Sequence, residues 1–137
     1  MSKIIFLHVA FTFLMTGVIW VIQLLHYPSF RFFPEQDFPQ KMKWHQFNIS
    51  WIVLPAMIIE LFTGGFICWK LKLSDQIWNI NLMLLILIWI STLVLQGPTH
   101  QKLLAGKNLR LIDFLIQTNW IRVLLWNVRS GIFIWLL

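Results

Sequence analysis

The stretch WHQFNISWIVLPAMIIELFTGGFICW, from Trp44 to Trp69, decides the predicted fold. It is long enough for one membrane crossing, because a hydrocarbon core of about 30 Å needs roughly 20 helical residues. Glu60 lies inside it between apolar residues, and a carboxylate that faces lipid at such a depth costs at least about 2.5 kcal/mol. We therefore expect Glu60 to face a protein interior and to have a partner there. Its predicted helical face also includes His45, Ile52, Ala56 and Thr63.

The composition is typical of an integral membrane protein. The 137 residues are 58% hydrophobic and 12% charged, whereas a soluble domain carries about 25% charged residues. The net charge of +6 arises from basic residues at the ends of apolar runs, where membrane topology explains them. The expected partner is thus the lipid bilayer, with no nucleic acid. Cys68 is the single cysteine, which excludes an intrachain disulfide.

The apolar pattern predicts an all-α fold, an antiparallel four-helix bundle in the membrane that forms one domain over residues 1–137. The expected spans are about residues 4–26, 44–69, 77–95 and 120–137. The first N-terminal run has no small-residue cleavage site after it, so we expect a retained helix. Pro28 and Gly97-Pro98 are expected to end the first and third helices. Residues 109–117 fit either a short interfacial helix before the fourth span or the first turns of a long fourth helix.

Basic residues are distributed unevenly between the two ends of the predicted bundle. The first and third connections hold Arg31, Lys41, Lys43, Lys102, Lys107 and Arg110, with Arg122 just inside the fourth span. The opposite side holds Lys3, Lys70 and Lys72. The positive-inside rule then puts both connections in the cytoplasm and both termini outside, in what we expect to be a bacterial inner membrane. A homo-oligomer or a larger membrane complex is compatible with this arrangement.

Polar residues form a stripe on each predicted span, and lipid cannot solvate such stripes. The stripes are His8, Thr12, Met15, Ile19, Gln23 and His26 on the first span, Asn81, Leu85, Thr92 and Gln96 on the third, and Arg122, Trp126, Arg129 and Phe133 on the fourth. We expect them to converge inside the bundle. Counting about 1.5 Å per residue places Glu60 and Arg129 at similar depths, which predicts a buried ion pair. His8 lies at the depth of Glu60 and is the second candidate partner.

Three further histidines, His26, His45 and His100, lie at the predicted cytoplasmic ends of their helices. Imidazole binds iron, zinc or copper, and haem iron takes axial histidine. These three residues are therefore the candidate metal ligands and, together with His8, the candidate cofactor ligands. Their spacings match no dense metal motif such as HExxH. The alternative is that they are solvated histidines at the membrane interface.

Three short motifs, LHVAFTF at 7–13, LPAMIIELFTGG at 54–65 and HQKLLAGKN at 100–108, are similar to the four-helix membrane families of oxygen-independent protoporphyrinogen oxidase and copper-resistance D-type proteins. In the oxidase family a first-helix histidine is associated with haem, and His8 matches its place. That family also has a lysine in its third helix, whereas residues 73–101 contain none. The resemblance implies the four-helix fold and a haem or another flat cofactor.

Two functions stay open from the sequence. The first is a redox or cofactor-binding membrane protein, with haem or a transition metal held by the histidines. The second is a non-catalytic membrane subunit or small carrier, in which the polar stripe is structural or lines a path. Whether the protein is an enzyme is not decided by any motif. No glycine-rich phosphate loop or nucleophile elbow is present in the sequence.

Overall fold

The computed structural model describes residues 1–71 and 74–136, and within them the fold is all-helical with no strand. The helices join into four rods. The first consists of α1 (Ser2–Val21), η1 (Ile22–His26), α2 (Tyr27–Ser29) and η2 (Phe30–Phe32), and the second is α3 (Phe38–Lys70). The third consists of α4 (Gln76–Ser91), η3 (Thr92–Gln96) and α5 (Gly97–Leu103), and the fourth is α6 (Leu109–Leu136). The predicted all-α fold with four helices is confirmed.

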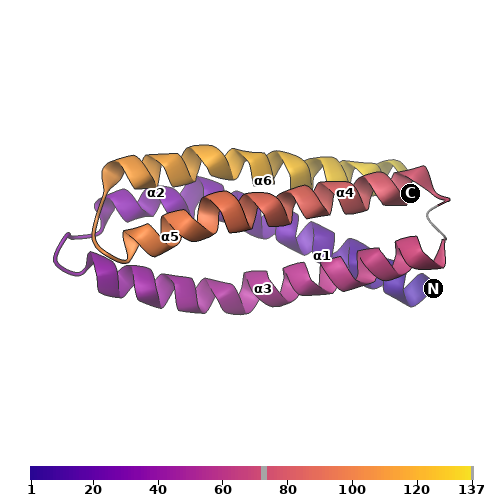
Figure 1. The fold of residues 1–137 in the computed structure, drawn as a ribbon, viewed down its shortest axis with the longest axis horizontal. Helices are drawn as coiled ribbons and strands as arrows, with labels where there is room; N and C mark the ends of the chain where they lie inside the picture. Colours follow the sequence, from indigo (N-terminus) through magenta and orange to yellow (C-terminus); the bar gives the residue numbers. More distant parts are fainter. Residues whose placement is uncertain (72–73, 137) are drawn as a thin grey trace.

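The rods run up, down, up and down, so both termini lie at the same end of the bundle (Figure 1). Helix α1 packs against α3 and α6, and α4 packs against the same two helices. Helices α3 and α6 therefore face each other across the bundle axis. This diagonal relation allows a side chain of α3 to meet one of α6 only in the interior.

Three rods among the described residues are long and apolar enough to cross a membrane: Ser2–Phe32, Phe38–Lys70 and Gln76–Leu103. The sequence predicts a fourth span in α6, which has 28 residues but more polar side chains. Asn119, Arg122 and Arg129 interrupt its apolar run, and all three are buried. The outer face of α6 from residue 120 onward is nevertheless apolar, because these three polar side chains point inward.

Two prolines do not end their helices, contrary to the prediction. A π-helical turn at Ile22–His26 precedes Pro28, and another at Thr92–Gln96 precedes Pro98. A proline ring clashes with the carbonyl four residues earlier in an α-helix, and the wider π turn gives it room. The first rod therefore continues to Phe32 and the third to Leu103, well beyond the predicted ends at 26 and 95.

Residues 109–117 form the first turns of α6. The prediction of a separate interfacial helix is therefore wrong, and the alternative of one long helix is confirmed. The helix begins after Asn108, whose Oδ1 accepts a hydrogen bond from the backbone N–H of Leu111 at 3.2 Å. Before it, Gly106 has a φ of 152°, a conformation that side chains other than glycine rarely adopt. This glycine allows the short turn between α5 and α6.

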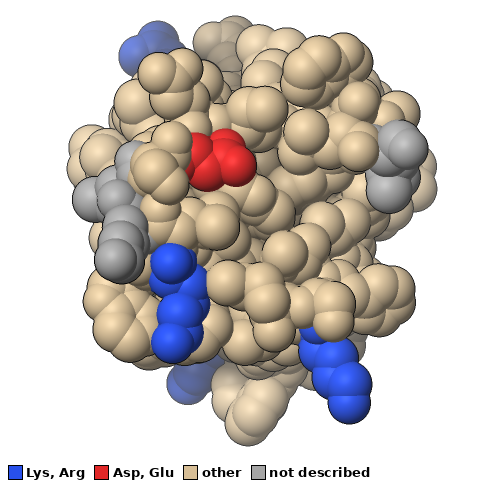
Figure 2. Space-filling view, turned by 90° about the vertical axis from the view of Figure 1, so that its right-hand side faces the viewer, with Lys and Arg blue, Asp and Glu red and all other residues tan. Residues whose placement is uncertain are grey.

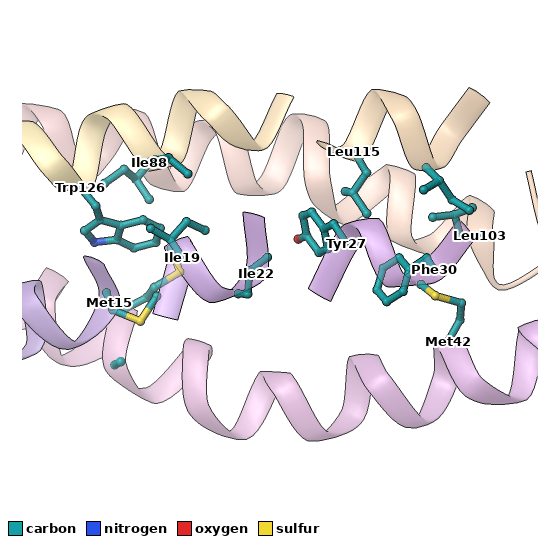
Figure 3. Close-up of a cluster of buried hydrophobic side chains, with 14 of the residues drawn as sticks. Met15, Ile19, Ile22, Tyr27, Phe30, Met42, Ile88, Leu103, Leu115 and Trp126 are labelled. Atoms are coloured by element: carbon teal, nitrogen blue, oxygen red, sulfur yellow. The ribbon is translucent and has the colours of Figure 1, made fainter. Parts of the chain in front are cut away.

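An apolar core runs along the bundle (Figure 3). Trp126, Met15 and Ile19 lie together at one level, and Tyr27 and Phe30 lie further along the axis. The outer surface is also apolar, with exposed large side chains on every rod, including Phe6, Leu25, Phe32, Trp51, Phe62, Leu93, Leu124 and Ile134. Monomeric soluble proteins rarely expose apolar surface so continuously.

Candidate functional site

Glu60 on α3 and Arg129 on α6 meet in the centre of the bundle. Both side chains are wholly buried, and Arg129 Nη1 donates to Glu60 Oε1 at 2.7 Å. This is the geometry of the ion pair that the sequence predicts. Thr12 Oγ1 donates to the same carboxylate oxygen at 2.8 Å, and Trp126 Nε1 donates to the other at 3.3 Å. Each oxygen of the carboxylate therefore has a donor.

The guanidinium of Arg129 binds partners from the other helices as well. Its Nε donates to Asn81 Oδ1 on α4 at 3.0 Å, and its Nη2 lies 3.2 Å from Thr12 Oγ1 and 3.3 Å from His8 Nε2 on α1. These five residues, Glu60, Arg129, His8, Thr12 and Asn81, are called the Glu60 cluster below. The cluster links all four rods through one buried charge pair, and all its members lie on the predicted stripes or on the face of Glu60.

His8 is enclosed within this cluster. Its Nδ1 is hydrogen-bonded to Thr63 Oγ1 at 2.8 Å, and its Nε2 faces Arg129. Its ring packs against Trp78 and Phe133, with ring centroids 5.8 and 5.7 Å away. Both ring nitrogens therefore have partners within the protein. Haem ligation by His8 stays a prediction.

Gly64 allows α3 to approach α1 beside His8. A Cβ atom built on Gly64 would lie 2.9 Å from His8 Cε1, closer than real side-chain contacts allow. A Cβ on the neighbouring Gly65 would meet no atom within 4 Å. Gly64 therefore fits the close approach of two helices that small residues permit in membrane bundles.

His26, His45 and His100 come together near the opposite end of the bundle. His26 Nε2 and His45 Nδ1 are 2.5 Å apart, and the His45 and His100 ring centroids are 5.9 Å apart. The nitrogens that face each other are occupied by hydrogen bonds, and within residues 1–71 and 74–136 no group of three or more histidine, cysteine or acidic side chains could hold a metal ion. The predicted metal site is not supported. His45 is buried, so the alternative of three solvated histidines does not describe it either.

Arg122 is a second buried arginine, located beside the histidines. Its Nε donates to Asn119 Oδ1 at 2.9 Å, and its Nη2 donates to the same oxygen and to the hydroxyl of Tyr27 at 3.0 Å. Its Nη1 reaches Thr92 Oγ1 only at 3.5 Å. All of these partners are neutral, and neither ion pair of the described part of the chain includes Arg122. Arg122 is only 4% exposed, and it has no carboxylate partner among the described residues.

A short hydrogen-bonded chain leads from Arg122 to His100. The Tyr27 hydroxyl accepts from Arg122 and is free to donate its own proton to His100 Nε2, 3.1 Å away. In that tautomer a neutral His100 carries its proton on Nδ1, which is buried and has no hydrogen-bond partner among the described residues. Trp89 Nε1 is another buried donor without a partner there. The sequence did not single out Tyr27 or Trp89, because each looks like an ordinary core or interface aromatic.

These donors belong to residues that line a cavity of about 280 Å³, bounded by α1, α3, α6 and the rod that contains α4 and α5. One end of the cavity is polar, with Tyr27, Gln46, Gln96, His100 and Arg122. The other end is apolar, with Met15, Ile19, Val53, Met57 and Trp126. The wall between α3 and η3 includes Leu54 and Leu93, which are 48% and 65% exposed on the outside of the bundle. The cavity therefore opens sideways, through the apolar surface.

No known protein family, curated protein or solved structure matches this chain. The similarity of its short motifs to two membrane families stays a prediction.

Proposed function

We propose that the protein is an integral membrane protein, and that it binds a small amphiphilic molecule in the cavity between α3 and η3. The ligand enters sideways from the bilayer. The protein acts as a non-catalytic carrier or as the binding subunit of a larger membrane complex. The single observation on which this proposal rests is a cavity with buried hydrogen-bond donors that opens through an apolar outer wall.

The outer surface supports insertion of all four rods. Three rods are long and apolar enough to span a membrane. On the fourth, Leu124, Val128 and Ile134 make the outer face of α6 apolar, and each of them is more than half exposed. Exposure of this apolar surface to water is unfavourable, whereas lipid tails offer it an apolar environment. The polar groups of α6 are solvated by the protein itself, as the membrane requires.

The distribution of charge supports an orientation with both termini outside, in a bacterial inner membrane. Figure 2 shows the end of the bundle that holds the termini, where basic groups are few and lie apart. The opposite end holds most of the lysine and arginine residues of the connections. Lys107 Nζ there donates to the carbonyls of Arg31 and Phe33, at 2.7 and 2.8 Å, and joins the two connections. The positive-inside rule assigns this end to the cytoplasm.

The cavity supports ligand binding better than the Glu60 cluster does. The polar atoms of Glu60, Arg129 and His8 have partners within the protein, and Asn81 Nδ2 is the buried donor of that cluster without one among the described residues. At the cavity, Trp89 Nε1 and His100 Nδ1 have no partner among the described residues, and Arg122 has no carboxylate there. A buried polar group without a partner is costly, and a bound molecule removes that cost. The Glu60 cluster then has the role of fixing the register of the helices around the cavity.

The proposal is tested by photolabelling of the protein in phosphatidylcholine nanodiscs with a single-chain diazirine amphiphile, followed by peptide mass spectrometry. We expect saturable labelling of α3 and of the α4–α5 rod at the cavity wall. An excess of unlabelled single-chain amphiphile abolishes this labelling, because a specific site saturates whereas nonspecific labelling of the lipid-facing surface does not. Val53→Trp, which fills the cavity, lowers this labelling several-fold, while Val128→Trp on the outer face of α6 leaves it unchanged. Labelling that is spread over the outer faces and never saturates would refute the proposal.

A further inference from the structure

We propose that the cavity selects a single-chain amphiphile with an acidic head group, a carboxylate or a phosphate, and that this head group pairs with Arg122. The chain of the ligand lies along the apolar end of the cavity, beside Met57 and Trp126. The inference rests on the proposed binding function and names the chemical class of the ligand.

The first argument is charge. Arg122 is buried, and arginine stays protonated in proteins. All five acidic side chains of the sequence are engaged or placed elsewhere: Glu35 and Asp37 are exposed in the first connection, Glu60 pairs with Arg129, Asp75 caps α4, and Asp113 pairs with Arg31. A buried charge without a counter-ion is strongly disfavoured. The missing anion therefore has to come from a bound molecule.

The second argument is the supply of hydrogen-bond donors. Three of the guanidinium's bonds are made by Nε and Nη2, which leaves Nη1 with only the 3.5 Å contact to Thr92. Trp89 Nε1 and His100 Nδ1, on residues that line the same cavity, have no acceptor in the part of the chain that the structure describes. An ionised carboxylate or phosphate accepts hydrogen bonds and donates none. An acidic head group thus matches a site that has donors in excess.

The third argument is the polarity and size of the cavity. Arg122 and His100 lie at its polar end, and Met15, Met57 and Trp126 lie at its apolar end. This gradient matches a molecule with one charged head and one apolar chain. The volume of about 280 Å³ lies at the lower limit of ligand pockets, roughly 300–1,000 Å³, which favours one chain over the two of a phospholipid. The opening at Leu54 and Leu93 faces the lipid, where such molecules are dissolved.

The test is competition for the labelled cavity in phosphatidylcholine nanodiscs. The competitors are decanoate, decyl phosphate, the neutral 1-decanol and a two-chain phosphatidate. We expect decanoate and decyl phosphate to displace the photolabel at concentrations at least about tenfold lower than 1-decanol, the ratio that corresponds to 1.4 kcal/mol. Phosphatidate is expected to compete no better than the bulk lipid. Arg122→Gln removes the preference for acids over the alcohol, whereas Arg110→Gln, an exposed arginine of the same helix, keeps it. Arg122→Lys retains the charge and part of the preference.

The possible outcomes separate this inference from the proposed function. Equal competition by decanoate and 1-decanol on the wild-type protein would show that the cavity binds a neutral ligand and would overturn the inference while the cavity function stands. Strong competition by phosphatidate would overturn the single-chain claim. Absence of saturable labelling with any probe would instead overturn the proposed function. Because the acid and the alcohol are compared on the wild-type protein, the result does not depend on whether Arg122→Gln folds.

Discussion

Removal of either partner of the Glu60–Arg129 pair should destabilise the bundle more than the loss of one ordinary contact. Both side chains are wholly buried, and their charged atoms are 2.7 Å apart. Breaking such a pair leaves an uncompensated charge, which costs about 3–5 kcal/mol. The neighbours in the structure allow this range to be divided between the two substitutions, Glu60→Gln and Arg129→Gln.

We expect Glu60→Gln to be the more harmful change. It leaves Arg129 buried and charged, with only the neutral Asn81, Thr12 and His8 as partners, and arginine cannot lose its proton to escape. Its cost should lie near the upper limit, about 5 kcal/mol. Arg129→Gln leaves Glu60 with its donors Thr12 and Trp126 and with the option of taking up a proton, so its cost should lie nearer about 3 kcal/mol.

The double variant decides whether the pair is an energetic unit. Equilibrium unfolding in mixed micelles of a mild detergent and dodecyl sulfate measures the free energy of unfolding of the four proteins. We expect the double variant to be less destabilised than Glu60→Gln alone, because it leaves no uncompensated charge in the interior. Strict additivity would refute the argument, because each side chain would then be stabilised independently of the other.

Three further results are expected. Gly64→Ala should lower stability by about 1–3 kcal/mol, because its Cβ would lie 2.9 Å from His8 Cε1, while Gly65→Ala, which meets nothing within 4 Å, should not destabilise; equal unfolding midpoints for the two variants would contradict this. Single cysteines at Gln36 and Ser74, in a background without the native cysteine, should react differently with an impermeant thiol reagent added to intact cells. We expect labelling at Ser74 and none at Gln36, and the reverse pattern would invert the proposed topology. The visible spectrum of the purified protein should lack a Soret band, and a band that shifts on reduction would contradict a non-catalytic binding function.

The sequence predicts the interior of the first rod as far as Gln23, inside the π turn. His8, Thr12, Ile19 and Gln23 are buried as expected. Beyond Gln23, Tyr27 rather than His26 is buried. A period of 3.6 residues cannot follow a turn that contains an extra residue. The hydrogen bond that Tyr27 makes with Arg122, 95 positions away in the sequence, was therefore missed.

The third rod shows the same effect. Ser91 and Gln96 both face inward, five residues apart, and Ser91 Oγ donates to Gln96 Oε1 at 3.1 Å. The charge pair in the centre of the bundle could be predicted from the sequence, because Glu60 is the one acidic residue inside the predicted spans and Arg129 lies at a similar depth. The cavity was not, since its volume is what remains after the side chains of several helices have packed. Helical spacing places Arg122 on an inner face, but it cannot show that no carboxylate lies beside it.

The Glu60–Arg129 pair has a consequence for the way the chain is made. The two residues are 69 positions apart, and they belong to different helical hairpins, α1 with α3 and α4 with α6. Synthesis runs from the N-terminus, so in the proposed membrane topology the first hairpin enters the bilayer with Glu60 before Arg129 has been made. A carboxylate tolerates this interval, because a proton can neutralise it, whereas an arginine would not. In this proposal Glu60 is already in the bilayer when the last helix is inserted, so the order of the helices gives Arg129 its counter-ion on arrival.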